Sequence, residues 1–211
     1  MAIRIQTRPP RAAPRSSDGR QRRSERSRDA IVQALYELTQ AGELEPTAQQ
    51  VAARARVGIR SVFRHFADMD SLYAELGAQV RALVLPLVRA EFRGSPSERA
   101  RELVARRAQV FELIAPHKRA ANLARRRSLF LQRQHAGLGR ELRAALLRAL
   151  PEVAAAPADL VEALDVALSF ECWDRLRSEQ RLSRERAAAA VERIVLALVA
   201  ELLRTRRGRT R

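Results

Sequence analysis

The sequence predicts an all-α protein of about nine helices, with a small N-terminal domain and a larger C-terminal one. Aromatic residues make up only 4% of the 211 residues, whereas alanine and leucine are abundant, a composition that suits close-packed helices and disfavours a large sheet. Apolar residues recur at helical spacing between breaks that contain glycine, proline or serine. The chain length and its 46% hydrophobic content allow two domains.

The first segment, residues 1–23, is predicted to be a disordered basic arm. It mixes proline, serine and arginine and has too few apolar side chains to offset the entropy cost of ordering. Arg22 and Arg23 precede the first predicted helix, where a basic arm can enter a minor groove or neutralise phosphates. An inert, solvated tail is an equally good interpretation of the same residues.

Residues 24–72 are predicted to form a three-helix DNA-binding domain. Its first helix is expected from about Arg26 to Gln40, with Gly42 ending it. Residues 47–66 then predict two short helices joined by a tight turn at Gly58, the first of them capped by the Thr47 side chain. The inward residues of that capped helix are Val51, Ala52 and Ala55.

The second short helix has an apolar side and a basic side. Val62 and Phe66, spaced i and i+4, form an inward stripe, and Arg60, Ser61 and Arg64 are left pointing outward. Guanidinium groups suit guanine edges and phosphates in the major groove, and a small hydroxyl allows close approach. The pair is therefore predicted to be a helix-turn-helix.

An ordinary pair of amphipathic helices would show the same periodicity. The short turn, and the absence of an acid on the second helix before Asp68, favour the DNA-binding interpretation. Net charge adds little, because residues 1–72 carry only +5 of the +16 total and Lys118 is the single lysine among 40 basic residues. The charge thus indicates attraction to polyanions in general.

The stretch from Arg26 to Leu72 resembles the DNA-binding domain of the TetR (tetracycline-repressor-like) family of bacterial transcription regulators. The shared pattern is a helix that ends before Gly42, then T-x-x-x-[IV]-A-x-x-A-x-V, then aromatic-x-H-F. The matching residues are Thr47, Val51, Ala52, Ala55, Val57, Phe63, His65, Phe66 and Leu72.

This chain departs from the family pattern at four positions. Arg56 and Gly58 replace the usual glycine and serine around the turn, Phe63 replaces a frequent phosphate-binding tyrosine, and Met69 replaces a common lysine. Backbone contacts are therefore expected to depend on arginines. The DNA-binding residues expected are Arg22, Arg23, Thr47, Gly58, Ile59, Arg60, Ser61, Phe63, Arg64 and His65, with His65 orienting the recognition helix.

Residues 73–211 are predicted to be a helical effector-binding and dimerisation domain. A long helix from Asp70 or Ser71 to about Phe92 has a predicted kink at Pro86. Further breaks are expected at residues 94–96, 116, 137–139, 151–157 and 178–183.

The last two predicted helices, 159–177 and 184–204, carry a wide apolar stripe. An ordinary monomer core would explain it, but the resemblance implies that these helices pair with their copies in a homodimer. The expected interface residues are Leu164, Leu168, Val191, Val195, Leu198 and Leu202.

The resemblance also implies a pocket for an unidentified small-molecule effector among the middle helices. Its candidate lining is Phe111, Phe130, Leu131, Phe170 and Trp173, each of which would serve equally well in a core. The function expected is that of a dimeric repressor released from a palindromic DNA operator by the effector. A nonspecific nucleic-acid-binding protein remains the alternative within the binding class.

Catalytic and metal chemistry find little support in the sequence. Cys172 is the only cysteine, so an internal disulfide is excluded and no thiolate cluster for zinc exists. The histidines lack metal-ligand spacing, and Gly137-Leu138-Gly139 lacks a Walker lysine. We expect no metal, no cofactor and no enzyme; an enzyme that uses the C-terminal helices, near Glu171 or Asp174, is a distant alternative.

No apolar run reaches the roughly 18 residues of a membrane span, and the N-terminus lacks the apolar core of a signal peptide. We therefore expect a cytoplasmic protein with no membrane partner.

Overall fold

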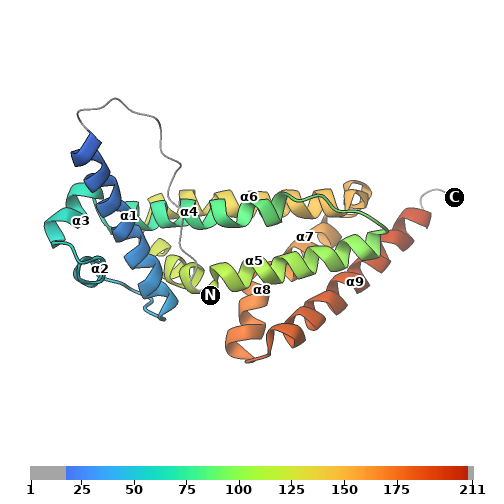
Figure 1. Ribbon diagram of the computed structural model, residues 1–211. Helices are drawn as coiled ribbons and strands as arrows, with labels where there is room; N and C mark the ends of the chain where they lie inside the picture. The colour runs from blue at the N-terminus through green and yellow to red at the C-terminus, as the bar shows by residue number, and fades with distance from the viewer. Residues whose placement is uncertain (1–17, 209–211) are drawn as a thin grey trace. The chain divides into compact units, whose positions relative to one another are not determined.

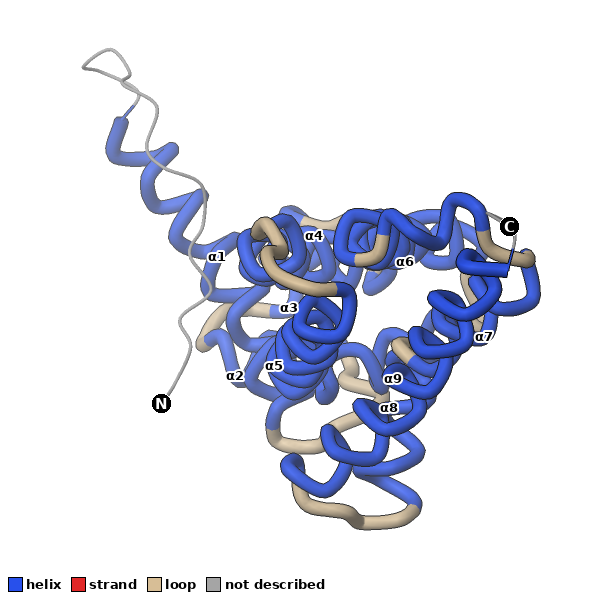
Figure 2. Tube along the Cα trace, turned by 90° about the vertical axis from the view of Figure 1, so that its right-hand side faces the viewer, coloured by secondary structure: helices blue, strands red, loops and turns tan. Residues whose placement is uncertain are grey.

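A computed structural model describes residues 18–208. Within that range the chain forms nine α-helices, one 3-10 segment and one π segment, and no strand (Figures 1 and 2). The all-α prediction is confirmed. Most of the predicted basic arm, residues 1–17, lies outside the described residues.

The helices belong to two compact units. The first comprises the chain up to Leu83 together with Pro116–Gly137, and the second comprises Val84–Ala115 and the chain from Leu138 onward. Three long helices, α4 (Met69–Arg89), α5 (Pro96–Arg125) and α6 (Leu129–Ala149), contribute to both units. The unit with the helix-turn-helix thus extends beyond residue 72.

The first unit is built on α1 (Asp18–Gln40), α2 (Ala48–Ala55) and α3 (Ile59–His65), which pack against one another (Figure 1). An ion pair of 2.6 Å between Arg54 of α2 and Glu37 of α1 reinforces this packing at the surface. The core side chains are Ile31, Leu35, Val51, Val62, Phe66, Leu72 and Leu76, all buried.

Helix α1 begins well before the predicted start at Arg26, so the predicted disorder is wrong for residues 18–23. Charged and polar side chains stabilise this extension through contacts one turn apart. Gln21 binds Glu25, and the Nε atoms of Arg23 and Arg26 donate to the carbonyls of Gly19 and Arg22. Arginine, glutamate and glutamine also have good intrinsic helix propensity. A segment rich in charged residues can therefore be helical, although its composition predicted disorder.

Two predicted breaks, at Pro116 and at Gly137–Gly139, are wrong because α5 and α6 run through them. Pro116 removes one helical hydrogen bond, but its neighbours Ala115 and His117 are buried, so packing holds the helix. Gly137 is itself buried, and a Cβ there would lie 2.7 Å from Nη1 of Arg81. The glycine therefore permits a close approach inside a helix and does not end it. The predicted long helix, α4, runs through Pro86 as expected and ends at Arg89, shortly before the predicted end at Phe92.

The second unit contains the last helices. The predicted helix 159–177 is divided into α7 (Ala158–Ala167), α8 (Phe170–Asp174) and a π segment (Arg175–Glu179), because Ser169 caps a new helix by accepting a hydrogen bond of 3.1 Å from the Cys172 N–H. Helix α9 (Arg184–Gly208) matches the prediction and packs along α7, and the predicted break before α7 holds the 3-10 segment Pro151–Ala155.

Candidate functional site

The first helix of the helix-turn-helix is closed at its N-terminus as predicted. Oγ1 of Thr47 accepts a hydrogen bond of 3.2 Å from the Gln50 N–H, and the Gln50 side chain accepts one of 2.7 Å from the Thr47 N–H. This reciprocal capping box satisfies two backbone donors that a helix start would otherwise leave free. Thr47 thus has a structural role in this chain, since its N–H and Oγ1 are both engaged in the cap.

The turn after α2 differs from the prediction, because Arg56 and not Gly58 has the unusual backbone. Arg56 has φ of 56° and ψ of 42°, in the left-handed region, whereas Gly58 has an extended conformation with φ of −70°. The N–H groups of Arg56 and Val57 donate to the carbonyls of Ala53 and Ala52 at 3.2 and 3.0 Å. These two bonds form a Schellman motif, which holds a non-glycine residue in a conformation that favours glycine.

Helix α3 is anchored by the two inward residues that the sequence predicted. Val62 and Phe66 are buried, and the guanidinium of Arg28 covers the Phe66 ring at 5.1 Å from its centroid. His65 is half-buried, and burial, together with the charges of Arg64 and Arg28, lowers the pKa of its imidazole. A neutral, inward-facing His65 fits the predicted role of orienting α3 better than a direct contact to DNA.

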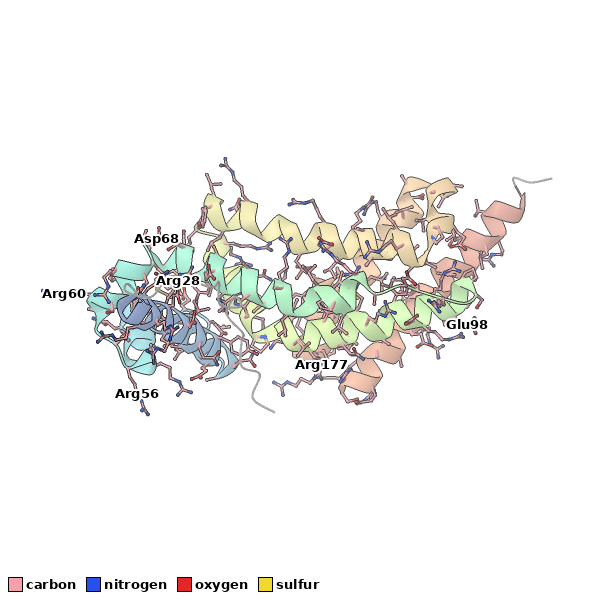
Figure 3. The ribbon with its side chains drawn as sticks, turned by 45° about the horizontal axis from the view of Figure 1, so that its top comes forward. Arg28, Arg56, Arg60, Asp68, Glu98 and Arg177 are labelled. Atoms are coloured by element: carbon pink, nitrogen blue, oxygen red, sulfur yellow. The ribbon has the colours of Figure 1, made fainter. Side chains whose placement is uncertain are left out.

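The outward face of α3 presents two arginines and two large apolar side chains. Arg60 and Arg64 are exposed, and Ile59 and Phe63 are 39% and 49% exposed. Figure 3 shows Arg60 pointing away from the helices of the first unit. Ser61 is half-buried and its Oγ accepts a hydrogen bond of 2.9 Å from Nη2 of Arg64, so the hydroxyl orients one of the two guanidiniums.

Further arginines lie on elements next to α3 in the first unit. Arg22 and Arg23 are exposed on α1, as expected for groups that could meet phosphates. Sequence reasoning missed Arg56, which is exposed at the turn and points outward (Figure 3). Its position directly before the recognition helix was the signal that could have identified it.

The five residues predicted to line an effector pocket are divided between the two units. Phe111, Phe170 and Trp173 form a buried aromatic cluster in the second unit, with ring centroids 5.7 Å apart for Phe111 and Phe170 and 6.4 Å apart for Phe111 and Trp173. Phe130 and Leu131 belong to the first unit, where Phe130 is exposed. The aromatic cluster is core packing, which the residue types alone could not distinguish from a pocket lining.

A different set of residues surrounds a concavity in the second unit. It is shallow, and the roughly 210 Å³ between its walls includes open solvent. None of its lining residues has a carboxylate, imidazole, thiol or hydroxyl group. The lining residues are Leu87, Val88, Phe92, Leu103, Arg106, Arg107, Val110, Leu142 and Ala145. Glu171, one of the two carboxylates considered for an enzyme, is exposed on α8.

Five of the six predicted dimer residues are buried within a single chain: Leu164, Leu168, Val191, Val195 and Leu202. These residues form the core of the second unit, in which α7 and α9 pack against each other. Leu198 is half-buried. The large apolar side chains that the described part of α7 and α9 leaves in solvent are Val166, 67% exposed, and Ile194, 45% exposed.

Among the described residues, no helix combines the length and the apolarity needed to cross a membrane. No group of three or more His, Cys, Asp or Glu side chains in residues 18–208 is arranged to hold a metal ion.

Three solved structures share this fold. A putative TetR-family transcriptional regulator from Mesorhizobium loti MAFF303099 has 17% sequence identity and a TM-score of 0.59, over 84% of this chain and 97% of that one. A transcriptional regulator from Rhodococcus sp. Rha1 has 20% identity and a TM-score of 0.64, over 84% and 96%. The multidrug binding protein EbrR, in complex with imidazole, has 22% identity and a TM-score of 0.58, over 87% and 97%.

No protein-family model and no curated protein matches the sequence. The structural similarity nevertheless confirms the resemblance at the level of the fold: the chain has the all-α fold of TetR-type regulators.

Proposed function

We propose that this protein is a transcriptional regulator that binds double-stranded DNA by placing α3 in the major groove. The observation that carries the proposal is the outward face of α3. It presents Arg60 and Arg64 with no acidic residue on the helix, and Val62 and Phe66 hold the opposite face in a core. A recognition helix needs both properties, because side chains read base edges accurately only from a fixed backbone.

The side chains on this face have distinct chemical roles in the proposed complex. Arg60 and Arg64 suit the O6 and N7 acceptors of guanine or the phosphates, and Ile59 and Phe63 suit the methyl group of thymine. Arg56, Arg22 and Arg23 supply phosphate contacts, which fix position without reading sequence.

The proposed active form is a homodimer on a palindromic operator. Val166 and Ile194 are large apolar residues exposed on α7 and α9, and a second copy of the chain would cover them. Two-fold symmetry presents two copies of α3, so the half-sites should lie one helical turn, about 34 to 36 Å, or a multiple of it apart.

The proposed regulation is release of DNA on binding of a small effector in the second unit. Support comes from the fold that the chain shares with EbrR, a multidrug binding protein solved with imidazole. By linkage, an effector can weaken operator binding only by its difference in affinity for the two states, typically about 5- to 150-fold.

Selection of bound fragments from random and genomic DNA by the purified protein tests the proposal. We expect one enriched palindromic sequence, and Arg60→Ala and Arg64→Ala should each weaken binding to it by about 1 to 3 kcal/mol where the arginine reads a base. Arg93→Ala is the matched control, since its side chain is 89% exposed and lies in the second unit.

Two outcomes would contradict the proposed function. Affinity that is equal for all sequences would instead identify a nonspecific nucleic-acid-binding protein. Unchanged operator binding in both α3 variants would show that another surface contacts DNA.

A further inference from the structure

Helix α3 leaves two large apolar side chains in solvent. Ile59 is 39% exposed and Phe63 is 49% exposed. Residues four apart lie on the same face of a helix, so the two side chains form one apolar row. A single exposed apolar residue is common on a protein surface, but two of them one turn apart on a helix of seven residues indicate a contact surface.

A row of arginines lies beside this apolar row. Arg60 and Arg64 are exposed and are also four residues apart. Each follows an apolar residue of the first row by one position, which places it roughly a quarter of a turn further around the helix. A partner of this face must therefore offer apolar groups directly beside groups that accept hydrogen bonds from guanidinium.

The major groove of DNA combines these two kinds of group. Its base edges carry one apolar group, the C5-methyl of thymine, and the strongest acceptors for arginine next to it are O6 and N7 of guanine. The absence of an acidic residue from α3 fits a polyanionic partner as well.

The apolar row is held rigidly enough to make specific contacts. Val62 and Phe66 anchor the opposite side of α3 in the core of the first unit. Ile59 is β-branched, which restricts its first torsion angle, and Phe63 has only two side-chain torsions. Neither side chain therefore loses much conformational freedom when it packs on a methyl group.

We propose that Ile59 and Phe63 are base-reading residues, each of which contacts the C5-methyl group of one thymine in the operator half-site. This inference deepens the proposed function and rests on it. Phe63 is assigned to a base and not to a phosphate because its ring has no hydroxyl group that could donate to a phosphate oxygen.

Helix geometry limits the distance between the two thymines. Residues four apart are separated by about 6 Å along a helix axis. Successive base pairs are separated by about 3.4 Å along the DNA axis. With α3 lying in the groove, the two methyl groups are expected at most two base pairs apart.

Replacement of thymine by deoxyuridine in the selected operator tests the proposal, because uracil lacks the C5-methyl group and keeps the same pairing with adenine. Each thymine of one half-site is replaced in turn, on either strand, and binding of the full chain is measured by fluorescence anisotropy. We expect two positions at which the affinity falls about 4-fold, the factor that corresponds to burial of one methyl-sized group. The other replacements should have no effect.

Variants assign each methyl group to a side chain. Phe63→Ala should abolish the response to uracil at one of the two positions and keep it at the other, and Ile59→Ala should do the reverse. Leu129→Ala is the matched control, since it removes a 72% exposed apolar side chain from α6 in the same unit, and it should keep both responses. A merely structural role of Phe63 would weaken binding to the thymine and uracil operators equally.

Several results would overturn the inference. These are equal affinity for the thymine and uracil operators, sensitive positions more than two base pairs apart, or an unchanged response to uracil in folded Ile59→Ala and Phe63→Ala proteins. The comparison of thymine with uracil uses the unmodified chain, so it decides even where a variant does not fold. Any of these results leaves the proposed DNA-binding function standing, whereas a selection that enriches no sequence overturns that function and this inference together.

Discussion

The guanidinium of Arg28 in α1 binds the carboxylate of Glu75 in α4 at 2.6 Å. The same guanidinium covers Phe66, the residue that ends α3. One side chain therefore connects the first helix, the recognition helix and the start of α4 within the first unit. This contact raises the pKa of Arg28 and lowers that of Glu75, mainly through the hydrogen bond between them.

We predict that a double-mutant cycle of Arg28→Ala and Glu75→Gln gives a coupling free energy of unfolding of about 0.5 to 1 kcal/mol at neutral pH, modest because both side chains are partly exposed. Because folding lowers the pKa of Glu75, this stabilisation is present at pH values above the usual pKa of a glutamate. It is lost as the pH falls through the pKa of Glu75 in the folded state. Urea denaturation of the full chain measures it. The exposed pair Arg93 and Glu91 is the control and should show coupling near zero; a coupling no larger in the Arg28 cycle would contradict the prediction.

The backbone of Arg56 leads to a second prediction. Because a non-glycine residue in the left-handed region is strained, Arg56→Gly should stabilise the protein against unfolding by up to about 1 kcal/mol, reduced by the greater freedom of glycine in the unfolded chain. Thermal denaturation measures the change. Lower stability in this variant would show that the arginine side chain makes a compensating contact.

Gly58 provides the reciprocal test. A Cβ at this position would meet no atom within 4 Å and its φ is negative, so Gly58→Ala should fold with unchanged or slightly higher stability. Gly58→Ser should add a few tenths of a kcal/mol by capping α3, which has no side-chain cap now. Destabilisation of both variants would restore the sequence-based view that the turn requires glycine at residue 58.

His117 makes stability depend on pH. It is buried in α5, and burial, with a smaller effect from Lys118, lowers the pKa of its imidazole to about 4. Unfolding returns the pKa to about 6.5, so the unfolded state takes up a proton first as pH falls and the folded state loses stability, by about 2 kcal/mol between pH 7 and pH 5. His117→Gln should remove that part of the slope in urea denaturation at the two pH values. Equal slopes in variant and unmodified chain would show that His117 does not titrate in this range.

Local chemistry explains what could be predicted from the sequence. The Thr47 cap depends on residues three positions apart, and the burial of Val62 and Phe66 depends on their spacing within one short helix. Neither needs knowledge of the rest of the chain. The left-handed Arg56 violates the local preference because two helix-closing hydrogen bonds outweigh the cost.

Long-range packing explains what could not be predicted. Helices α5 and α6 continue through Pro116 and Gly137, and Gly137 lies close to Arg81, a residue distant in sequence. Arg106 and Arg107 are identical neighbours in the sequence, and only the fold provides one with a carboxylate and leaves the other without. A wide apolar stripe similarly does not reveal which of its edges faces the core of its own chain.

That ambiguity determines the last prediction, which concerns the dimer. Ile194 and Val195 are adjacent on α9, but Ile194 is 45% exposed and Val195 is fully buried. Ile194→Glu and Val166→Glu should fold and shift the protein from dimer to monomer, because a carboxylate would be buried at the proposed interface without a partner. Val195→Glu should instead unfold the second unit, since it places the charge in the core.

Light scattering gives the mass of each variant, and circular dichroism gives its helix content. Leu129→Glu, at a 72% exposed position in the first unit, is the control and should stay dimeric. A folded Ile194→Glu, Val166→Glu double variant that keeps the dimer mass would rule out this face as the interface.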